Sequence, residues 1–230
     1  MKVEIWSDVA CPWCYVGKRR FEEAVEEFDG EVKVTWRSFE LEPDAPDVRD
    51  EPLDELLAQK YGGGKEQARQ MIERMSQMAE GEGLEFNLMD AKAGNTFDAH
   101  RLIHFAADRG TSDAMKERLL RAYMTEGKRV SDRETLVALA EDVGLDAEEA
   151  RTMLATDDYA DDVRHDERTA RELGCRGVPF FVIAGRYQLT GAQPADTFLE
   201  ALRSAADELE PAQQDAGIVC DDEGCRVEIS

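Results

Sequence analysis

Two cysteines three residues apart, in the motif Cys11-Pro12-Trp13-Cys14, connect two segments with different apolar patterns. Apolar residues between Val3 and Val9 predict a short β-strand before the motif. Apolar residues at roughly helical spacing follow the motif, and we expect the helix to begin at Pro12, because proline is favoured in the first turn. Two Cα atoms at this spacing lie about 5–6 Å apart, which a disulfide can bridge.

Cys11 would then lie at the amino end of the helix, where an anion is stabilised. Unpaired backbone N–H groups and the helix dipole favour negative charge at that end. We therefore expect the pKa of the Cys11 thiol to lie moderately below its ordinary value of about 8.5. In thiol–disulfide exchange Cys11 would be the nucleophile. Cys14, on the more buried side of the helix, would resolve the mixed disulfide.

The charge balance of the chain restricts its partners. The 230 residues include 28 basic and 51 acidic side chains, a formal net charge of −23, while 42% of residues are hydrophobic and can build a core. Such a charge disfavours nucleic acids and anionic membranes as partners. The acids are dispersed and lysine is scarce, so we predict a halophilic protein whose self-repulsion is screened by salt, the alternative being an ordinary acidic protein.

Neither a membrane span nor a signal peptide is expected from the sequence. No run of about 18 apolar residues occurs, and the sequence opens directly on the predicted strand. We therefore predict a cytoplasmic protein. In that compartment cysteines serve catalysis or metal binding more often than structural cross-linking.

Strand and helix patterns divide the chain into three parts. Residues 1–50 and 174–210 show β-α-β and β-β-α patterns and predict one discontinuous thioredoxin-like domain. Residues 51–173 predict a helical insertion domain, helical from about Leu53 and interrupted at glycines. Residues 211–230 predict a polar linker followed by a short hairpin. The predicted fold class is α/β, thioredoxin-like, with a large all-helical insertion and a short C-terminal cysteine-containing extension.

Three segments resemble the DsbA family of thioredoxin-fold proteins, and specifically its FrnE-type cytoplasmic branch. They lie in the order expected of the family and are residues 6–18 with the dithiol, residues 95–102 (Asn-Thr-Phe-Asp-Ala-His-Arg-Leu) and residues 177–183 (Gly-Val-Pro-Phe-Phe-Val-Ile). The likeness covers roughly residues 2–209. It implies a thiol–disulfide oxidoreductase in which Pro179, preceded by a cis peptide bond, faces Cys11 across the site.

The resemblance also implies which residues bind the substrate. A turn at Pro179 exposes the backbone of Val178, which can pair with an extended peptide as a strand does. The helix that carries His100 and Arg101 would form a wall of the substrate cleft. The expected substrate-binding residues are therefore Pro12, Trp13, Val178, Pro179, His100 and Arg101.

Three further cysteines leave alternatives open. Cys220 and Cys225 flank an acidic turn and form either a second redox pair that exchanges with the dithiol or a hairpin disulfide. Together with Cys11 and Cys14 they also supply four thiolates for a zinc site, although Pro-Trp between two thiols does not suit a metal-binding turn. We interpret Cys175 as a small buried hydrophobe.

Two helical patterns have a structural and a functional interpretation. His100 and His104 are four residues apart, a spacing that can bind a metal, but no third ligand is evident and we expect His104 to be packed. Met71, Met75 and Met78 share one helical face. We interpret this face as core packing, with a soft peptide-binding surface as the alternative.

The sequence therefore predicts a thiol–disulfide oxidoreductase, with isomerase activity left open, that acts on protein or small-molecule disulfides. We expect no cofactor and no metal, with a cellular thiol reductant or oxidant as the redox partner. The direction of electron flow and a homodimer are left open. One alternative is a glutathione-dependent isomerase or transferase of the same fold, which typically has serine in place of the first thiol. The other is the zinc-binding protein.

Overall fold

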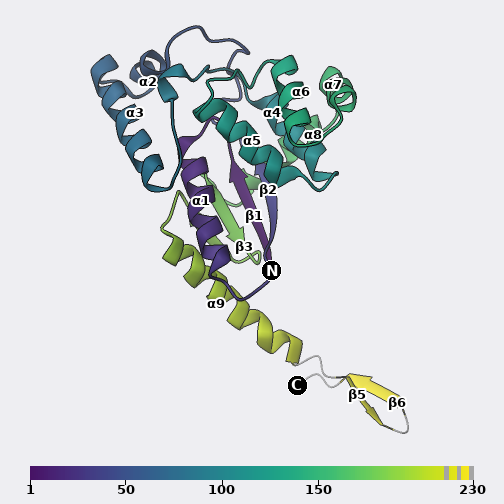
Figure 1. Cartoon of the computed structure of the whole chain (residues 1–230). Coiled ribbons are helices and arrows are strands. Elements are labelled where there is room, and N and C mark those ends of the chain that lie inside the picture. Colours follow the sequence, from purple (N-terminus) through teal and green to yellow (C-terminus); the bar gives the residue numbers. More distant parts are fainter. Residues whose placement is uncertain (215–217, 222–223, 228–230) are drawn as a thin grey trace.

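The structure, a computed structural model, describes residues 1–214, 218–221 and 224–227, and side chains as far as Glu208 (Figure 1). Its centre is a sheet in the strand order β2-β1-β3-β4. The strands are β1 (Lys2–Ser7), β2 (Lys33–Ser38), β3 (Phe180–Ile183) and β4 (Tyr187–Thr190). β1 is parallel to β2 and antiparallel to β3, and β4 is antiparallel to β3.

One face of the sheet is covered by α1 (Pro12–Glu26) and α9 (Ala195–Gln214). Because side chains alternate along a strand, Ile5 and its neighbour Phe181 point to the same face. There Phe21 of α1 and Phe198 of α9 pack on Phe181, with ring centroids 5.5 and 4.5 Å away. This aromatic cluster fixes α1, and therefore the motif at its start, against the sheet.

The opposite face of the sheet packs on α8 (Ala160–Glu172). Trp6 and Phe180 form a second buried cluster with Ala170 of that helix. The indole N–H of Trp6 donates to the backbone oxygen of Asp166 at 2.9 Å. The last helix of the segment between β2 and β3 therefore anchors that segment to the sheet.

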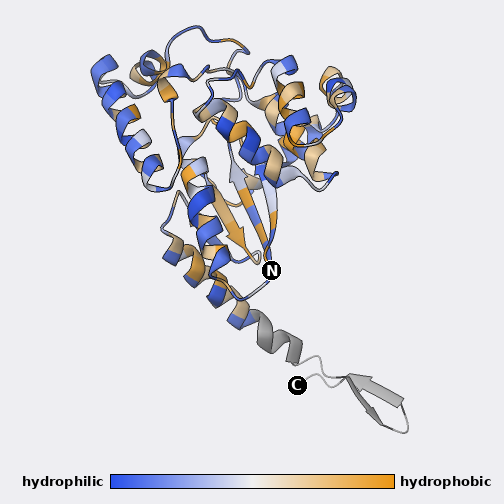
Figure 2. Cartoon of the chain, in the orientation of Figure 1, coloured by the Kyte–Doolittle hydropathy of each residue, from blue (hydrophilic) through white to orange (hydrophobic). Residues whose placement is uncertain are grey.

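All the remaining helices lie between β2 and β3. Figure 1 shows α2 and α3 on one side of this segment and α4, α6, α7 and α8 on the other. The elements are α2 (Leu53–Tyr61), α3 (Gly64–Gly81), the 3-10 turn η1 (Leu88–Asp90), α4 (Phe97–Ala107), α5 (Ser112–Met124), α6 (Arg133–Asp142) and α7 (Ala147–Ala155). In Figure 2 β3 is hydrophobic, β1 and β2 mix hydrophobic and hydrophilic residues, and hydrophilic residues predominate on α3.

Residues 82–96 depart from the predicted helical pattern, which allowed interruptions only at glycines, because they contain only the turn η1. Their backbone groups pair instead with the loop that follows β2. The N–H of Asn95 donates to Pro46 at 3.0 Å, and Ala93 accepts from Arg49 at 3.3 Å. Tertiary hydrogen bonds thus replace the helical ones in this stretch.

The C-terminal part also corrects one boundary. α9 continues through Pro211 to Gln214, whereas the sequence pattern predicted a linker from residue 211. A helix can continue past a proline, and the Ala-Gln-Gln that follows it favours helix. Beyond it, β5 (Ile218–Asp221) and β6 (Gly224–Val227) form the predicted hairpin, with Cys220 opposite Cys225 in register.

No helix within the described ranges is both long and apolar enough to cross a bilayer.

Candidate active site

The two cysteines of the motif lie one helical turn apart at the start of α1. α1 begins at Pro12, as predicted, and Cys11 is its N-cap with extended backbone angles. The backbone N–H of Cys14 donates to the carbonyl of Cys11 at 3.0 Å. Both cysteines are free thiols and buried, with exposed fractions of 3% and 2%. The pair therefore has the placement that reversible disulfide formation needs.

The loop before β3 faces Cys11. The Sγ of Cys11 donates to the carbonyl oxygen of Val178 at 3.6 Å, and the peptide bond between Val178 and Pro179 is cis. α1 approaches this loop closely because residue 17 is glycine. A Cβ atom at Gly17 would lie 2.9 Å from Cγ of Pro179. Sequence segments more than 160 residues apart thus meet at one sulfur atom.

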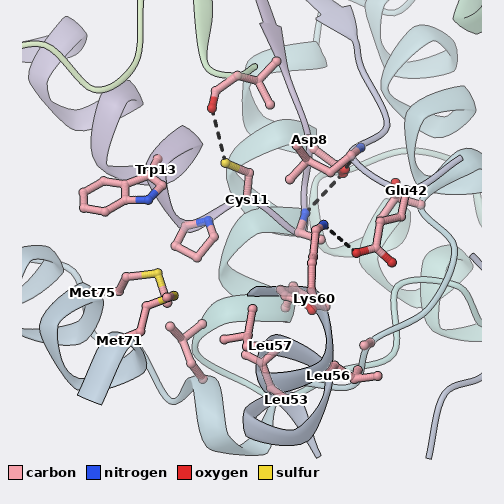
Figure 3. A pocket seen from close by; sticks show the side chains of 18 of the residues that line it. Asp8, Cys11, Trp13, Glu42, Leu53, Leu56, Leu57, Lys60, Met71 and Met75 are labelled. Carbon is pink, nitrogen blue, oxygen red and sulfur yellow. Dashed lines mark hydrogen bonds and ion pairs between the residues drawn. The ribbon is translucent and has the colours of Figure 1, made fainter. Parts of the chain in front are cut away.

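A cleft of about 320 Å³ opens beside Cys11. One side is formed by the start of α1 and by Gly177 and Val178, while α2 and α3 form the other (Figure 3). Its apolar lining includes Pro12, Trp13, Leu53, Leu56, Leu57, Met71 and Met75. Trp13 is 39% exposed at the edge of the motif. The cleft can hold an apolar group of a substrate next to the reactive sulfur.

The methionine face of α3 is therefore more than core packing. Met71 and Met75 line the cleft, although Met75 also packs against the main core. Met78, one turn further along, is 40% exposed and does not line it. The interpretation of this methionine face as core packing was thus wrong for Met71. The surroundings of Met71 depend on how α3 lies against α1, which local sequence does not determine.

A carboxylate at the rim of the cleft pairs with two cations. Glu42 contacts Lys60 at 2.6 Å and Arg49 at 2.7 Å, and Figure 3 shows the Lys60 contact. All three residues line the cleft. Two positive groups thus share one carboxylate at the rim.

Beneath the dithiol lies the buried carboxylate of Asp8. Its oxygens accept the backbone N–H of Leu41 at 2.7 Å and of Ala10 at 3.3 Å. Burial acts to raise the pKa of Asp8, but the neighbouring His100, the hydrogen bond from the N–H of Leu41 and the charge of Lys116 outweigh it, so the pKa falls below its ordinary value. Asp8 is therefore ionised at neutral pH.

His100 stands behind the cleft. It is fully buried, with Nε2 3.4 Å from Asp8. Burial lowers its pKa despite the neighbouring carboxylate, so the imidazole is neutral at pH 7. The structure therefore corrects the prediction that His100 lines the cleft: it reaches the site through Asp8. His104 is packed, as predicted, against Ser38 and Asp166.

Arg101 does not line the cleft either. It is buried, and its guanidinium donates to the backbone oxygens of Asp158 and Met153, both at 2.8 Å, and of Thr156. It also pairs with Asp98. These carbonyls lie at the end of α7 and just after it, where helical partners are missing. The resemblance placed Arg101 on the correct helix, but the side chain points into the helical segment.

Three further cysteines lie outside the motif. Cys175 is half-buried against the Trp6 cluster, which agrees with its interpretation as a hydrophobe, and burial raises the pKa of its thiol. The side chains of Cys220 and Cys225 lie outside the described residues. In the part of the chain that the structure does describe, no three His, Cys, Asp or Glu side chains are grouped as metal ligands. The zinc hypothesis, which needs Cys220 and Cys225, stays untested.

One residue of the site was missed by the sequence analysis. Lys116 of α5 is buried, and its Nζ donates at 3.3 Å to the carbonyl of Ser7, the residue before Asp8. The sequence contains one signal for this position. Lys116 lies three residues before Leu119 and four before Leu120, which places a lysine on the apolar face of a helix.

The strand order, with a dithiol at the start of the first helix and a helical segment between β2 and β3, defines a thioredoxin-like fold with a helical insertion. This confirms the predicted fold class. The chain belongs to the DSBA-like thioredoxin domain family, whose model matches residues 2–203. The family-level resemblance is thereby confirmed, while the FrnE-type branch stays a prediction.

Known proteins resemble the chain over nearly its whole length. A probable DsbA oxidoreductase from Streptomyces coelicolor is 45% identical, with a TM-score of 0.88 and coverage of 99% of both chains. The uncharacterized protein YwbO of Bacillus subtilis is 32% identical over 202 residues, 87% of this chain and 94% of its own. The cytosolic disulfide reductase DsbM from Pseudomonas aeruginosa is 19% identical, with a TM-score of 0.60 and coverage of 93% and 99%; this likeness concerns the fold alone.

Proposed function

We propose that the protein is a thiol–disulfide oxidoreductase that acts through Cys11 and Cys14 on disulfides of proteins, peptides or small molecules. One observation carries the proposal: the Sγ of Cys11 lies at the amino end of α1, beside the Val178 carbonyl and next to an apolar cleft. Membership of a DsbA-like family supports it.

In the reducing direction the dithiol gives two electrons to the substrate. The thiolate of Cys11 attacks one sulfur of the substrate disulfide, that S–S bond breaks, and the first substrate thiolate leaves. Cys14 then loses its proton and attacks Sγ of Cys11. The mixed disulfide breaks, the second thiolate leaves, and the Cys11–Cys14 disulfide remains. A cellular thiol restores the dithiol; oxidation and isomerisation of substrates use the same steps in other orders.

The surroundings of Cys11 suit an extended peptide. The backbone at Val178 offers hydrogen-bonding groups beside the sulfur, as a strand edge does. An apolar side chain next to the substrate cysteine would enter the cleft past Pro12 and Trp13. In this proposal Pro179 sets the position of the Val178 carbonyl.

Reduction of insulin with dithiothreitol as the terminal reductant tests the proposal. We expect the protein to accelerate the reaction, Cys11→Ser to abolish the acceleration, and Cys14→Ser to stall as a mixed disulfide. Cys175→Ser is the matched control and should retain turnover. Conjugation of glutathione to an electrophile without disulfide turnover would instead support the isomerase or transferase alternative.

The hairpin cysteines have their own test. We expect Cys220 and Cys225 to act either as a relay to the dithiol or as a hairpin disulfide. A double serine variant that leaves turnover and the reduction potential of Cys11–Cys14 unchanged excludes the relay. One zinc bound per chain, found by metal analysis of protein purified without chelator, would favour the zinc hypothesis.

The reduction potential of the Cys11–Cys14 pair decides the direction of electron flow. A value near about −270 mV indicates a reductase, and one near about −120 mV an oxidase. A cytoplasmic location and a thiol system as partner stay part of the proposal, to be checked by cell fractionation and by trapping mixed disulfides on Cys14→Ser. Sedimentation of the intact chain tests for a homodimer.

A further inference from the structure

Lys116 belongs to the helical segment, yet its amino group lies at the end of β1, where the chain leads into the motif. The residue is 1% exposed, and its Nζ donates to the carbonyl of Ser7 at 3.3 Å. Ser7 ends β1 and directly precedes Asp8. The Nζ atom also stands 5.6 Å from the centre of the Trp36 ring. A single side chain of α5 thus connects the helical segment to the strand that leads into the motif.

The environment of Lys116 contrasts with that of Lys18, which is also buried. Lys18 of α1 pairs directly with Glu22, Asp113 and Glu117. Lys116 has no comparable direct ion pair among the described residues; its hydrogen bond goes to a neutral carbonyl. Because a buried charge is costly unless it is compensated, this placement calls for anionic groups nearby.

The anionic groups near Lys116 are those of the redox centre. Burial lowers the pKa of Lys116 to about 8, and the charge of Lys18 adds to this effect, while Cys14, Asp8 and Cys11 act to raise it. The neutral His100 faces the same cluster. Because Cys14, Asp8 and Cys11 act to raise the pKa of Lys116, ionisation of either thiol favours the protonated lysine.

Burial also disfavours the charged form of Cys14, the thiolate. Burial and the neighbouring Cys11 raise the pKa of its thiol well above the ordinary value, whereas the charge of Lys116 and the backbone N–H of Asp8 act to lower it. The resolving step needs Cys14 as a thiolate, since the thiol itself is a poor nucleophile. A buried positive charge that lowers the pKa of Cys14 would therefore favour the resolving step.

We propose that Lys116 is a positioning residue of the redox centre, whose ammonium group stabilises the negative charge on Cys14 while this sulfur attacks the mixed disulfide at Cys11. The inference rests on the proposed function. In the step, Cys14 releases its proton to a solvent base and its electron pair forms the bond to Sγ of Cys11. The bond from Cys11 to the substrate sulfur breaks, and that sulfur leaves as a thiolate. The helical insertion therefore contributes to electron transfer as well as to the cleft.

Dithiobis(nitrobenzoate) separates the two halves of the reaction on the full-length reduced chain. Attack by Cys11 releases one nitrothiobenzoate anion, and closure by Cys14 releases a second, each visible by absorbance. Loss of a neighbouring opposite charge raises a thiol pKa by about 1–3 units. Each unit by which the thiol pKa rises lowers the thiolate fraction about tenfold. The more basic thiolate is in turn about threefold more nucleophilic, so the net loss of rate is about threefold per unit. In Lys116→Met we therefore expect the second phase to slow about threefold to thirtyfold at pH 7, with its pH profile displaced upward.

Lys128→Met is the control, because it removes a partly exposed lysine of the same helical segment that pairs with the carboxylate of Glu126. Its second phase should keep the pH profile of the parent. An unchanged second phase and pH profile in Lys116→Met would overturn the role of Lys116. If the unsubstituted chain itself released only one anion, the proposed function would fail instead, so the two failures are distinct.

A measurement on the unsubstituted chain covers the case in which Lys116→Met does not fold. Carbon-13 labelling of lysine side chains allows the titration of Lys116 to be followed by NMR in both redox states. Disulfide formation removes the thiol charges, so the titration midpoint should be lower in the oxidised protein than in the reduced one. Equal midpoints in the two states would contradict electrostatic coupling between Lys116 and the dithiol.

Discussion

Gly17 and Pro179 approach so closely that no side chain fits between them: a Cβ atom at residue 17 would lie 2.9 Å from Cγ of Pro179. This contact holds α1, and with it Cys11, against the Val178 carbonyl. The distance of 3.6 Å between Sγ of Cys11 and that carbonyl depends on it.

Gly17→Ala should therefore move the loop and weaken turnover. A crowded methyl group costs about 1–3 kcal/mol, which exceeds the gain of up to about 1 kcal/mol from better helix propensity. We expect lower free energy of unfolding in urea and several-fold slower insulin reduction. Gly81→Ala is the control, since a Cβ there meets no atom within 4 Å. Equal behaviour of the two variants would show that the contact is dispensable.

Met71→Gln should impair recognition without changing the redox step. It places a polar amide in the apolar cleft, and we expect KM for a peptide disulfide with apolar flanking residues to rise about threefold to tenfold. The rate with a small hydrophilic disulfide should stay the same. Met78→Gln serves as the control on the same helix, outside the cleft. A rise in KM that is equal for both variants would argue against the cleft as the binding site.

Arg101→Met should affect stability and not catalysis. It removes the guanidinium donor from three backbone carbonyls, of which that of Met153 is buried, so we expect the free energy of unfolding to fall by about 1–3 kcal/mol. Turnover per folded molecule should be unchanged. Arg133→Met removes an exposed partner of the same Asp98 and should cost under about 1 kcal/mol. Loss of turnover in folded Arg101→Met would instead support the prediction that Arg101 binds the substrate.

A buried carboxyl group beside the cleft-lining Leu41 makes stability depend on pH. Arg164 contacts both Glu40, at 2.5 Å, and Glu167, at 2.9 Å. Burial, and then the charge of Glu167, raise the pKa of Glu40 from 4.5 to about 7 against the effect of Arg164. Between these two pH values the folded state holds a proton that the unfolded state has released.

Stability should therefore fall as pH rises from about 4.5 to about 7, by about 1–2 kcal/mol after solvent screening is allowed for. Urea unfolding at several pH values measures this slope. Glu40→Gln should flatten it, and Glu66→Gln, at an exposed position, should leave it intact. A slope that survives Glu40→Gln would assign the effect to other groups.

Salt should stabilise the protein. With a net charge of −23, self-repulsion acts across the surface, and it weakens as the Debye length shortens from about 10 Å at 0.1 M to about 3 Å at 1 M salt. We expect Tm to rise with sodium chloride by several degrees. Matched concentrations of an uncharged osmolyte control for general solvent effects. A flat response would favour the ordinary acidic protein over the halophilic one.

Local sequence patterns were sufficient for the features that local chemistry decides. The helix start at Pro12 and the placement of Cys11 follow from a proline, a spacing and a strand that precedes them. The hairpin that pairs Cys220 with Cys225 follows from alternation around a turn. The division of the chain into domains rests on the same patterns and stays a prediction, which limited proteolysis can test.

Features that depend on long-range packing could not be predicted. Lys116 meets Ser7 across 109 residues, and a lysine on an apolar helix face does not reveal its partner. Arg101 lies on the helix that the family resemblance singled out, but its carbonyl partners, more than 50 residues later, decide where it points. Residues 82–96 lost their predicted helix to hydrogen bonds with the loop after β2.

The helix pair α2 and α3 supplies one wall of the cleft, while Cys11, Cys14, Asp8 and Lys116 all come from elsewhere in the chain. In the proposed function, substrate selection and electron transfer therefore depend on different stretches of the polypeptide. Grafting residues 53–81 from a homologue should transplant substrate preference and leave the dithiol potential where it was.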